Sequence, residues 1–394
     1  MELFTVAVIT FQQRHHLERC LKQIFCQDYK AIELIVCDDN SCDFYEDEVE
    51  AYISMRKTRQ IRSVTIQKQP SCTGKAGCLK TALSLAHGTY VLFLEPVHEL
   101  CSKKVLSKLA ACFRSKQCSV LVSRSLPCLE DGRCAGNVCP SDAEFWQLRD
   151  ATPDWLFVQY AAHPKEPSVC SAPVCFRKDL LDKAGFDTDY PSIPFWMIWL
   201  KICAAQDTEK VTVAVLDEIT VHTCIYQAED DLGYLSFGMK DRYYLDSIRL
   251  LREYALPEMK RFSATDRARC RHAAAVLQIK MEERKWYTWR FKKRLLWKIK
   301  KMPVLCMGRL YRMRTGNFYI DTQKELKMLL IFSFLYYLHI PFSPEGNLDA
   351  FWALLAAVSF AVLALKTAVK FCTGTGKAVL DKRADRRADK RKTG

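Results

Sequence analysis

The chain has 394 residues, of which 49% are hydrophobic, and it carries a formal net charge of +14. This hydrophobic content excludes an intrinsically disordered protein, and the length suits one large domain or two ordinary ones. The positive charge is concentrated near the end of the chain. Residues 280–314 hold 13 Lys and Arg against two Glu, and residues 377–394 hold eight against three Asp. Such clusters suit an anionic membrane surface or a nucleic acid.

The first residues, MELFTVAVITF, lack the basic segment and long apolar core of a secretory signal. We therefore expect the main body of the chain in the cytosol, where its 19 cysteines stay reduced. No CxxC pair is present, which argues against a zinc ribbon. Cys128, Cys134 and Cys139 form the tightest cluster, but their spacing is unlike that of common zinc sites, so we expect ordinary small buried residues.

The first hundred residues alternate apolar, β-rich runs with segments whose apolar residues recur at helical spacing. In one such segment, Leu17, Leu21 and Ile24 fall on a single helical stripe. This alternation is typical of βαβ units and predicts an α/β fold with a mostly parallel sheet. The expected strands are 4–11, 31–39, 63–69 and 89–95, and the expected helices are 15–27, 43–57 and 77–88.

Polar segments follow three of these strands, namely TFQQ at 10–13, CDDNS at 37–41 and EPVHE at 95–99. Ligands of parallel sheets bind at the carboxyl ends of the strands. We therefore expect these three segments to converge on one crevice.

Beyond residue 100 the pattern is less regular, and strand signals stop near residue 230. A strand and loop are expected at 121–142, a strand and short helix at 171–186, an apolar helix at 194–206, two strands at 210–227, and helices at 238–254 and 265–301.

Two uncharged stretches, residues 328–344 and 350–365, lie at the short limit of the roughly 17–25 residues that span a bilayer. The second can extend to Phe371, because the amine of Lys366 can reach the surface. Basic residues precede the first stretch and follow the second, which places both flanks in the cytosol. We expect a membrane hairpin that holds the protein at the cytoplasmic side of the cell membrane. A helical hairpin inside a soluble bundle is the alternative.

The segment FTVAVITFQQRHHLERCLKQIFCQDYKAIELIVCDDNSCD resembles the opening of the family-two glycosyltransferases, which have the GT-A fold. Those proteins begin with a strand, an aromatic-polar loop, a helix ending near QDY and a strand ending DDxS. The counterparts here are Phe11, residues 27–29 and residues 38–41. A weaker similarity continues through GTYVLFL and CFRKDLLDKAGFDTDYP, about 195 residues in all. Some bacterial members also have C-terminal membrane helices.

The resemblance implies an inverting transfer of a sugar from a nucleotide-sugar donor, with UDP- or dTDP-sugars expected, to a cell-surface glycan or lipid-linked acceptor. By the same resemblance, Phe11 packs near the base, and Asp39 hydrogen-bonds the base edge with Asp38 beside it. Glu95 would hold the ribose. The chemistry also needs a cation for the leaving diphosphate and a general base for the acceptor hydroxyl.

The family's metal motif, usually FLDxDD, is altered to FLEPVHEL. Glu95 stands at the first Asp, and Val97 stands at the Asp that reaches the metal. Valine has no lone pair to donate, and the imidazole of His98 is a poor ligand for Mg²⁺. We therefore expect no divalent metal at this motif.

The base motif, roughly YxxIEDWxxWLR in many members, is altered as well, because Pro194 and Phe195 occupy the acidic positions. Neither side chain can accept a proton, so the catalytic residues stay unassigned. The carboxylates nearby in sequence are Asp187, Asp189 and Asp217, none of which is at the matching position.

Two functional hypotheses follow. In the first, the chain is an active glycosyltransferase in which a basic side chain such as Lys75 or Arg177 replaces the metal. In the second, it is a catalytically inactive nucleotide-sugar-binding or scaffold subunit of a glycan-assembly complex, beside an active partner glycosyltransferase. No nucleic-acid partner is expected, because the basic segments flank apolar stretches and no recognition module is visible.

The expected organisation has five parts, and its basic segments would contact anionic membrane lipid. They are a GT-A glycosyltransferase-like domain at 1–230, a basic, interfacial helical extension at 231–301, a linker at 302–327, the membrane hairpin at 328–371 and a basic cytosolic tail at 372–394.

Overall fold

The computed structural model describes residues 2–149, 151–205, 211–225 and 239–283, with residues 301, 303 and 304. The chain divides into two compact units, Met1–Trp289 and Arg290–Gly394, and nearly all described residues belong to the first. The expected linker, membrane hairpin and basic tail therefore lie almost entirely outside the described residues. Within the described part of the chain, no helix is long and apolar enough to cross a bilayer.

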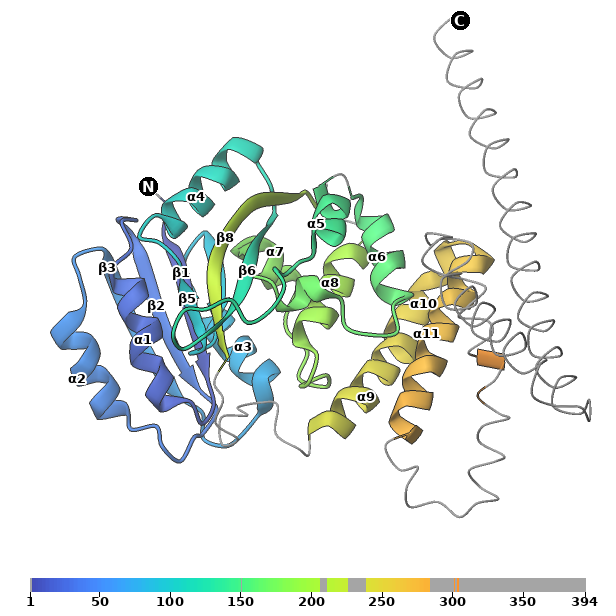
Figure 1. The fold of residues 1–394 in the computed structure, drawn as a ribbon, viewed down its shortest axis with the longest axis horizontal. Helices are drawn as coiled ribbons and strands as arrows, with labels where there is room; N and C mark the ends of the chain where they lie inside the picture. The colour runs from blue at the N-terminus through green and yellow to red at the C-terminus, as the bar shows by residue number, and fades with distance from the viewer. Residues whose placement is uncertain are drawn as a thin grey trace, which may run out of the picture. The chain divides into compact units, whose positions relative to one another are not determined.

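The first half of the sheet confirms the predicted alternation of strands and helices (Figure 1). Four parallel strands lie in the order β3-β2-β1-β4, so the chain moves outward from β1 to β3 and then returns to the other side of β1. A reversal of this kind leaves a crevice at the carboxyl ends of the strands. The elements are β1 (Phe4–Thr10), α1 (Arg14–Phe25), β2 (Ile32–Asp38), α2 (Glu46–Arg56), β3 (Ile61–Lys68), α3 (Gly74–Leu85) and β4 (Tyr90–Leu94).

The second half of the sheet adds antiparallel pairings to a sheet whose pairings remain mostly parallel, as expected. Here β7 pairs antiparallel with both β4 and β6, β6 pairs parallel with β8, and β5 pairs antiparallel with β8. The two strands expected at 210–227 are one strand, β8, whose register against β6 shifts around Arg124. The strands are β5 (His98–Leu100), β6 (Val120–Leu129), β7 (Val174–Arg177) and β8 (Val213–Ile225).

The remaining helices follow β5 along the chain. They are α4 (Val105–Lys116), α5 (Asp142–Arg149), α6 (Pro153–Ala161), η1 (Ser168–Ser171), α7 (Lys178–Ala184), α8 (Pro194–Ala204), α9 (Met239–Arg249), η3 (Leu250–Ala255), α10 (Leu256–Glu258), η4 (Met259–Arg261) and α11 (Ala264–Glu283).

Two hydrophobic cores cover the two faces of the sheet. Val6 and Val8 of β1 face a core shared with α1, α2 and α4, whereas Ala7 and Ile9 face a core shared with α3, α6 and α8. All residues of β1 and β2 are buried, which is expected of parallel strands covered on both faces. Helices α9 and α11 contribute to the second core through Ile248 and Leu277. The helical region and the α/β region therefore stabilise one another.

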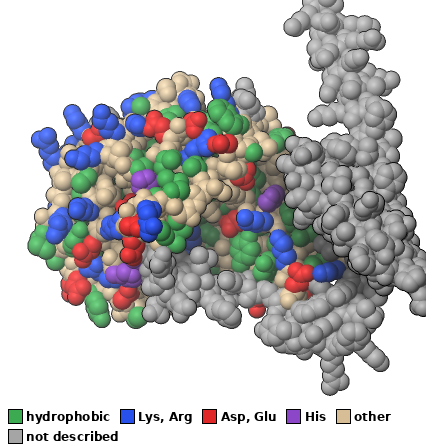
Figure 2. All heavy atoms as spheres, viewed as in Figure 1, with side chains coloured by type: hydrophobic (Ala, Val, Ile, Leu, Met, Phe, Trp, Pro, Cys, Tyr) green, Lys and Arg blue, Asp and Glu red, His purple; other side chains and the backbone are tan. Residues whose placement is uncertain are grey.

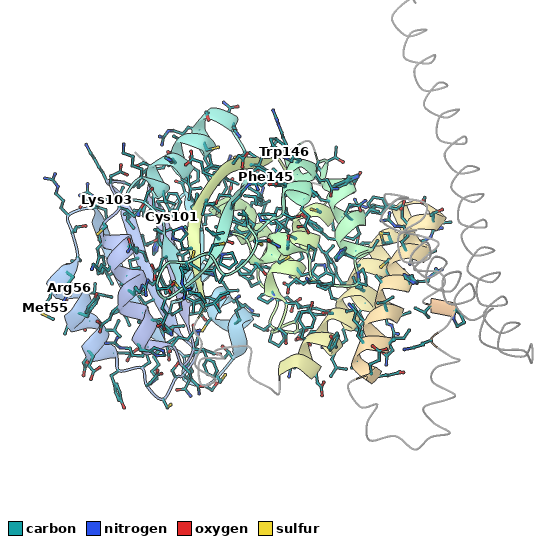
Figure 3. The ribbon with its side chains drawn as sticks, in the orientation of Figure 1. Met55, Arg56, Cys101, Lys103, Phe145 and Trp146 are labelled. Atoms are coloured by element: carbon teal, nitrogen blue, oxygen red, sulfur yellow. The ribbon has the colours of Figure 1, made fainter. Side chains whose placement is uncertain are left out.

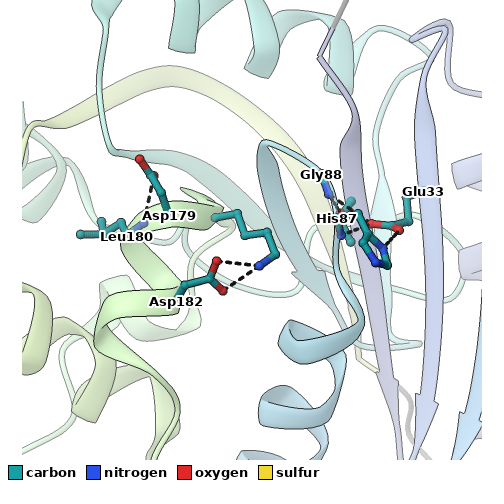
Figure 4. Close-up of polar contacts among 8 residues, drawn as sticks. Glu33, His87, Gly88, Asp179, Leu180 and Asp182 are labelled. Atoms are coloured by element: carbon teal, nitrogen blue, oxygen red, sulfur yellow. Dashed lines mark hydrogen bonds and ion pairs between the residues drawn. The ribbon is translucent and has the colours of Figure 1, made fainter.

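The amino ends of the strands are fixed by the buried carboxylate of Glu33 (Figure 4). It accepts hydrogen bonds from Thr5 Oγ1 (2.5 Å), the His87 N–H (2.8 Å) and the Gly88 N–H (3.3 Å). Burial raises the pKa of Glu33, but these hydrogen bonds outweigh it, and the net pKa lies below its usual range. A Cβ on Gly88 would come within 2.6 Å of the Thr5 backbone nitrogen, so a side chain does not fit there. The hydrogen bonds of Glu33 and the close approach of Gly88 to Thr5 hold together the amino ends of the strands, opposite the crevice.

The surface of the described residues carries both signs of charge, with Lys and Arg intermixed with Asp and Glu over the face in view (Figure 2). One cation is buried instead. The Arg124 guanidinium lies over the Phe145 ring, 4.1 Å from its centroid, and pairs with Asp142 and with Asp217 (2.8 Å). Phe145 is on α5, next to the half-exposed Trp146 (Figure 3). Asp217 is thus engaged in holding β6 and β8 together.

Candidate functional site

The loops after β1 and β2 are tied together by Asp38, which is fully buried. Its carboxylate accepts hydrogen bonds from the Ser41 N–H (2.7 Å) and the Ser41 hydroxyl (2.6 Å). The Ser41 oxygen in turn accepts the N–H of Gln12 (2.7 Å). Burial raises the pKa of Asp38 despite the contacts with Ser41. The structure therefore places Asp38 in the framework of the crevice, and its expected nucleotide contact stays a prediction.

Asp39, also fully buried, holds the loop that leads into α3. One carboxylate oxygen accepts from the Thr73 N–H (2.7 Å) and the Thr73 hydroxyl (3.0 Å), and the other from the Gly74 N–H (2.9 Å) and the Cys72 thiol (3.1 Å). A carboxylate offers about four acceptor positions, and these contacts fill them. In this arrangement Asp39 sets the position of the residue that follows Gly74, which is Lys75.

Beyond this loop lies a cavity of about 1160 Å³. It is enclosed by Gln13 after β1, the segment 72–75, the end of β4 and the turn after it, and residues from the loops before η1 and α8. Residues of β8 and α9 complete its wall. Its volume exceeds the roughly 300–1,000 Å³ of common small-molecule sites, so an extended ligand fits. Of the four residues expected to contact nucleotide, Glu95 lines this cavity, whereas Phe11, Asp38 and Asp39, at the ends of β1 and β2, do not.

The segment FLEPVHEL forms a tight turn between β4 and β5. The His98 N–H donates to the Glu95 carbonyl (2.8 Å), and the Glu95 N–H donates to His98 Nδ1 (3.0 Å). The Val97 carbonyl accepts the N–H of Cys224 on β8 (2.8 Å). Burial lowers the pKa of His98 more than Glu95 raises it, so the ring is neutral at pH 7. Its Nδ1 is an acceptor within the turn, and its role is to hold the turn in shape.

The Glu95 carboxylate is paired with Lys75, at 2.5 Å between Oε1 and Nζ. The ammonium also lies over the Phe195 ring, 5.3 Å from its centroid. Burial alone would lower the pKa of Lys75, but the Glu95 carboxylate and then Glu166 outweigh it, and the pKa is raised. Burial likewise raises the pKa of Glu95, and attraction to Lys75 and His98 brings it below its usual range. Both groups are therefore charged at neutral pH.

A divalent metal does not fit this motif. Val97 stands where a ligand is needed, and the Glu95 carboxylate already pairs with the Lys75 ammonium. Among the described residues, no group of three or more His, Cys, Asp or Glu side chains is arranged to hold an ion. Glu99, the remaining acid of the turn, pairs with Arg19 and accepts the Cys224 thiol (3.1 Å). The cation that faces the cavity at this position is Lys75.

Where the family motif has an acidic pair, this chain has Pro194 and Phe195, and Phe195 belongs to an aromatic cluster. Pro194 begins α8, and the Phe195 ring makes edge contacts with Phe93 (6.2 Å between centroids) and Phe186 (5.9 Å). The three carboxylates nearby in sequence do not line the cavity. Asp187 pairs with Lys201 at 3.6 Å, for example.

Arg177, the other basic residue considered as a replacement for the metal, is far from the crevice. It pairs with Asp179 at 2.6 Å, and it lies in register with Tyr90, at the amino end of β4. The cavity begins at the carboxyl end of β4, which is the opposite end of the same strand. Arg177 is therefore excluded as a cation for a ligand in the cavity.

Sequence reasoning missed a carboxylate in the cavity wall, Glu166, which lies in the loop before η1. Its N–H donates to the hydroxyl of Tyr243 on α9 (3.1 Å). Burial raises the pKa of Glu166 to about 7, although Lys75 and a hydrogen bond with Cys170 act against this shift. The segment PKEP has no periodicity, and the only signal that could have drawn attention to it is an acid between two prolines.

Residues 5–135 match the family model described as Glycosyl transferase family 2. The match runs from β1 to the loop after β6, and it includes Asp39, Lys75 and Glu95 but not Glu166 or Phe195. For these residues it confirms the resemblance found in the sequence.

Two curated glycosyltransferases are similar over part of the same region. The chain is 30% identical over 95 residues to the UDP-Glc:alpha-D-GlcNAc-diphosphoundecaprenol beta-1,3-glucosyltransferase WfaP of Escherichia coli, which is 24% of this chain and 35% of that protein. It is 32% identical over 102 residues to the GalNAc(5)-diNAcBac-PP-undecaprenol beta-1,3-glucosyltransferase of Campylobacter jejuni. The aligned residues are 26% of this chain and 32% of that protein. The matches therefore span about a third of the length of each relative.

Among solved structures, S. aureus TarS 1-349 in complex with UDP-GlcNAc has a TM-score of 0.49 and 16% identity to this chain. The superposition covers 84% of this chain and 86% of that one. We draw no conclusion about ligand or activity from this likeness.

Proposed function

We propose that this chain is a family-two glycosyltransferase that transfers a sugar from a nucleotide-sugar donor to a lipid-linked or cell-surface glycan acceptor. The observation that carries the proposal is the family match over residues 5–135, since it spans the strands whose carboxyl ends border the cavity. The two curated relatives are both named as β-1,3-glucosyltransferases with diphosphate-linked polyprenyl acceptors. UDP-glucose and a polyprenyl-diphosphate GlcNAc are therefore the first donor and acceptor to test.

The leaving nucleoside diphosphate needs a counter-charge, and we assign this role to Lys75. Its ammonium is fixed between Glu95 and Phe195, with a quarter of its side chain exposed, in the wall of the cavity. A fixed cation in a site shielded from water stabilises developing negative charge without reorganising at the moment of reaction. Arg242 is a second cation of the cavity wall, and we assign to it a contact with a phosphate of the same donor. Transfer on this basis needs no divalent metal.

The test is a donor panel on the full chain purified in detergent. UDP-glucose, UDP-GlcNAc, dTDP-glucose and GDP-mannose are each incubated with the acceptor, with EDTA or with Mn²⁺, and nucleoside diphosphate release and glycolipid product are measured. One donor should be consumed at equal rates in EDTA and Mn²⁺. Asp39→Ala is the control for contaminating activity, because it removes every contact by which that carboxylate holds residues 72–74.

The outcomes separate the two hypotheses formed from the sequence. Turnover that stops in Asp39→Ala supports the enzyme. Nucleotide binding without turnover of any donor favours the inactive nucleotide-sugar-binding or scaffold subunit, which would act beside a partner glycosyltransferase. Absence of nucleotide binding would refute both.

We also propose that the catalytic unit works at the cytoplasmic side of the cell membrane, held there by residues 328–371. The support is the sequence alone, which has two apolar stretches with basic residues on their outer flanks. A cysteine placed in the connecting loop, residues 345–349, should react with an impermeant thiol reagent from outside intact cells. Protection of that cysteine would refute the hairpin.

A further inference from the structure

The cavity has two acidic residues among the described residues that line it, Glu95 and Glu166. Glu95 is bonded to Lys75 at 2.5 Å, and attraction to that ammonium opposes its protonation. A carboxylate held in this way is a weak proton acceptor. The Glu166 carboxylate is attracted to Lys75 as well, but its hydrogen bond is with the Cys170 thiol, a weak donor, so of the two acids it is the better proton acceptor.

Two helices and two prolines hold the loop of Glu166 against the cavity. The backbone N–H of Glu166 is bound by the Tyr243 hydroxyl of α9. Lys280 of α11 donates to the carbonyl of Pro164 (3.3 Å), which holds the preceding part of the same loop. The prolines at 164 and 167 restrict the backbone on either side. A loop backbone held in this way keeps its position when a ligand enters, as the loop that carries a catalytic group must.

From this placement we infer that Glu166 is the catalytic residue that accepts the proton of the acceptor hydroxyl during sugar transfer. The inference rests on the proposed function. The hydroxyl oxygen forms a bond to the anomeric carbon of the donor sugar as the bond from that carbon to the diphosphate oxygen breaks. The bonding electrons leave with the nucleoside diphosphate, whose charge Lys75 faces. The hydroxyl proton passes to the Glu166 carboxylate, and water later removes it.

The surroundings of Glu166 suit this role near neutral pH. Burial raises its pKa to about 7, and the positive charge of Lys75 keeps it from rising further. A base is most effective when its pKa lies close to the working pH. The titratable or charged groups on the elements around it include Cys72 and Lys75 beside and on α3, Glu95 and His98 at the β4–β5 turn, Cys224 on β8, His163 and Lys165 on its own loop, Cys170 on η1, Arg242, Tyr243 and Tyr244 on α9, and Lys280 on α11.

The experiment compares Glu166→Gln, Glu166→Asp and the matched control Glu253→Gln with the wild type in the detergent-purified full chain. Glu253 is an exposed glutamate of η3 that pairs with Arg249, and it does not line the cavity. UDP binding is measured by calorimetry, and transfer is measured across pH 5.5–8.5. Glu166→Gln should bind UDP within about twofold of wild type and transfer sugar about 10²–10⁴-fold more slowly. Glu253→Gln should match the wild type in both.

The pH profile gives a readout that a merely structural role would not change. Wild-type kcat/KM should rise with pH, with a midpoint near pH 7, because the carboxylate form is the proton acceptor. Glu166→Asp should restore part of the activity lost in the Gln variant and shift that midpoint. If Glu166→Gln does not fold, which loss of UDP binding would reveal, the wild-type profile and the Asp variant still decide the question.

Two results would overturn the assignment while leaving the proposed function intact. One is transfer by a folded Glu166→Gln above a tenth of the wild-type rate, and the other is a wild-type kcat/KM that does not vary over this pH range. A wild type that binds nucleotide but consumes no donor would refute the proposed function and the role of Glu166 together.

Discussion

Replacing Glu166 by Gln should change how the stability of the fold depends on pH. The substitution keeps the size of the side chain and removes one titrating group from the cavity wall. Burial raises the pKa of this carboxyl from 4.5 to about 7 in the folded chain. A carboxyl whose pKa rises on folding contributes stability that is complete below its unfolded pKa and is lost as the pH rises through its folded pKa. The wild type should therefore lose this contribution between about pH 4.5 and pH 7.

The size of the effect follows from the shift. A change of about 2.5 pKa units corresponds to roughly 3 kcal/mol in the free energy of unfolding. Most of that change falls between pH 5 and pH 8. In a unit of this size, each kcal/mol moves the Tm by about 2–4 °C, so the effect is roughly 5–10 °C.

The assay is the Tm of wild type, Glu166→Gln and Glu253→Gln, measured at pH 5 and pH 8 in one detergent at one scan rate. All other titrating groups are common to the variants, so their effects cancel when the pH-induced changes are compared. From pH 5 to pH 8, the Tm of wild type and Glu253→Gln should fall roughly 5–10 °C more than that of Glu166→Gln. An equal change in Tm from pH 5 to pH 8 for Glu166→Gln and wild type would refute the reasoning. It would mean that folding does not change the pKa of this carboxyl.

Three further predictions concern residues on either end of the sheet. Lys75→Met should slow sugar transfer by about 10²–10³-fold, which is the usual cost of removing one fixed hydrogen-bond donor from a developing anion. An unchanged rate would exclude Lys75 as the cation that stabilises the leaving diphosphate. Gly88→Ala should cost about 1–3 kcal/mol in a denaturant titration, because the new Cβ meets the Thr5 backbone, and a neutral effect would contradict the packing described. Glu33→Gln should lower the Tm at pH 7, and the difference should vanish as the pH falls below 4.5, because the folded pKa of Glu33 is depressed. A difference in Tm that does not shrink at all as the pH falls below 4.5 would show that the lost contacts do not depend on the charge.

The sequence predicted the first four strands and the helices between them to within a few residues, because their apolar patterns are regular and their contacts are local in sequence. The prediction of two strands at 210–227 was wrong for a physical reason. The polar residues Asp217 and Glu218 interrupt the apolar pattern, but Asp217 pairs with the buried Arg124 of β6. A pairing across the sheet therefore keeps one strand continuous where the local pattern indicates two.

The candidate site was predictable only in part. Alignment on the family motif found Glu95 and the replacement at Val97, because both adjoin a regular strand. It missed Glu166, because neither the burial of that residue nor its contact with Tyr243 leaves a local pattern. The expected base contact of Asp39 stays a prediction, and the structure adds a second role, since this carboxylate fixes the loop before Lys75.

The wall of the cavity has two origins along the chain. Residues inside the family match supply Lys75 and Glu95, while Glu166, Phe195 and Tyr243 come from beyond residue 135. On the proposed function, these two parts of the chain can change separately in evolution, the first retaining the donor as the second takes up new acceptors. A chimera meant to change the acceptor would therefore exchange only the part beyond residue 135. The exchanged part must include α9, because a graft that stops near residue 230 leaves the cavity wall incomplete.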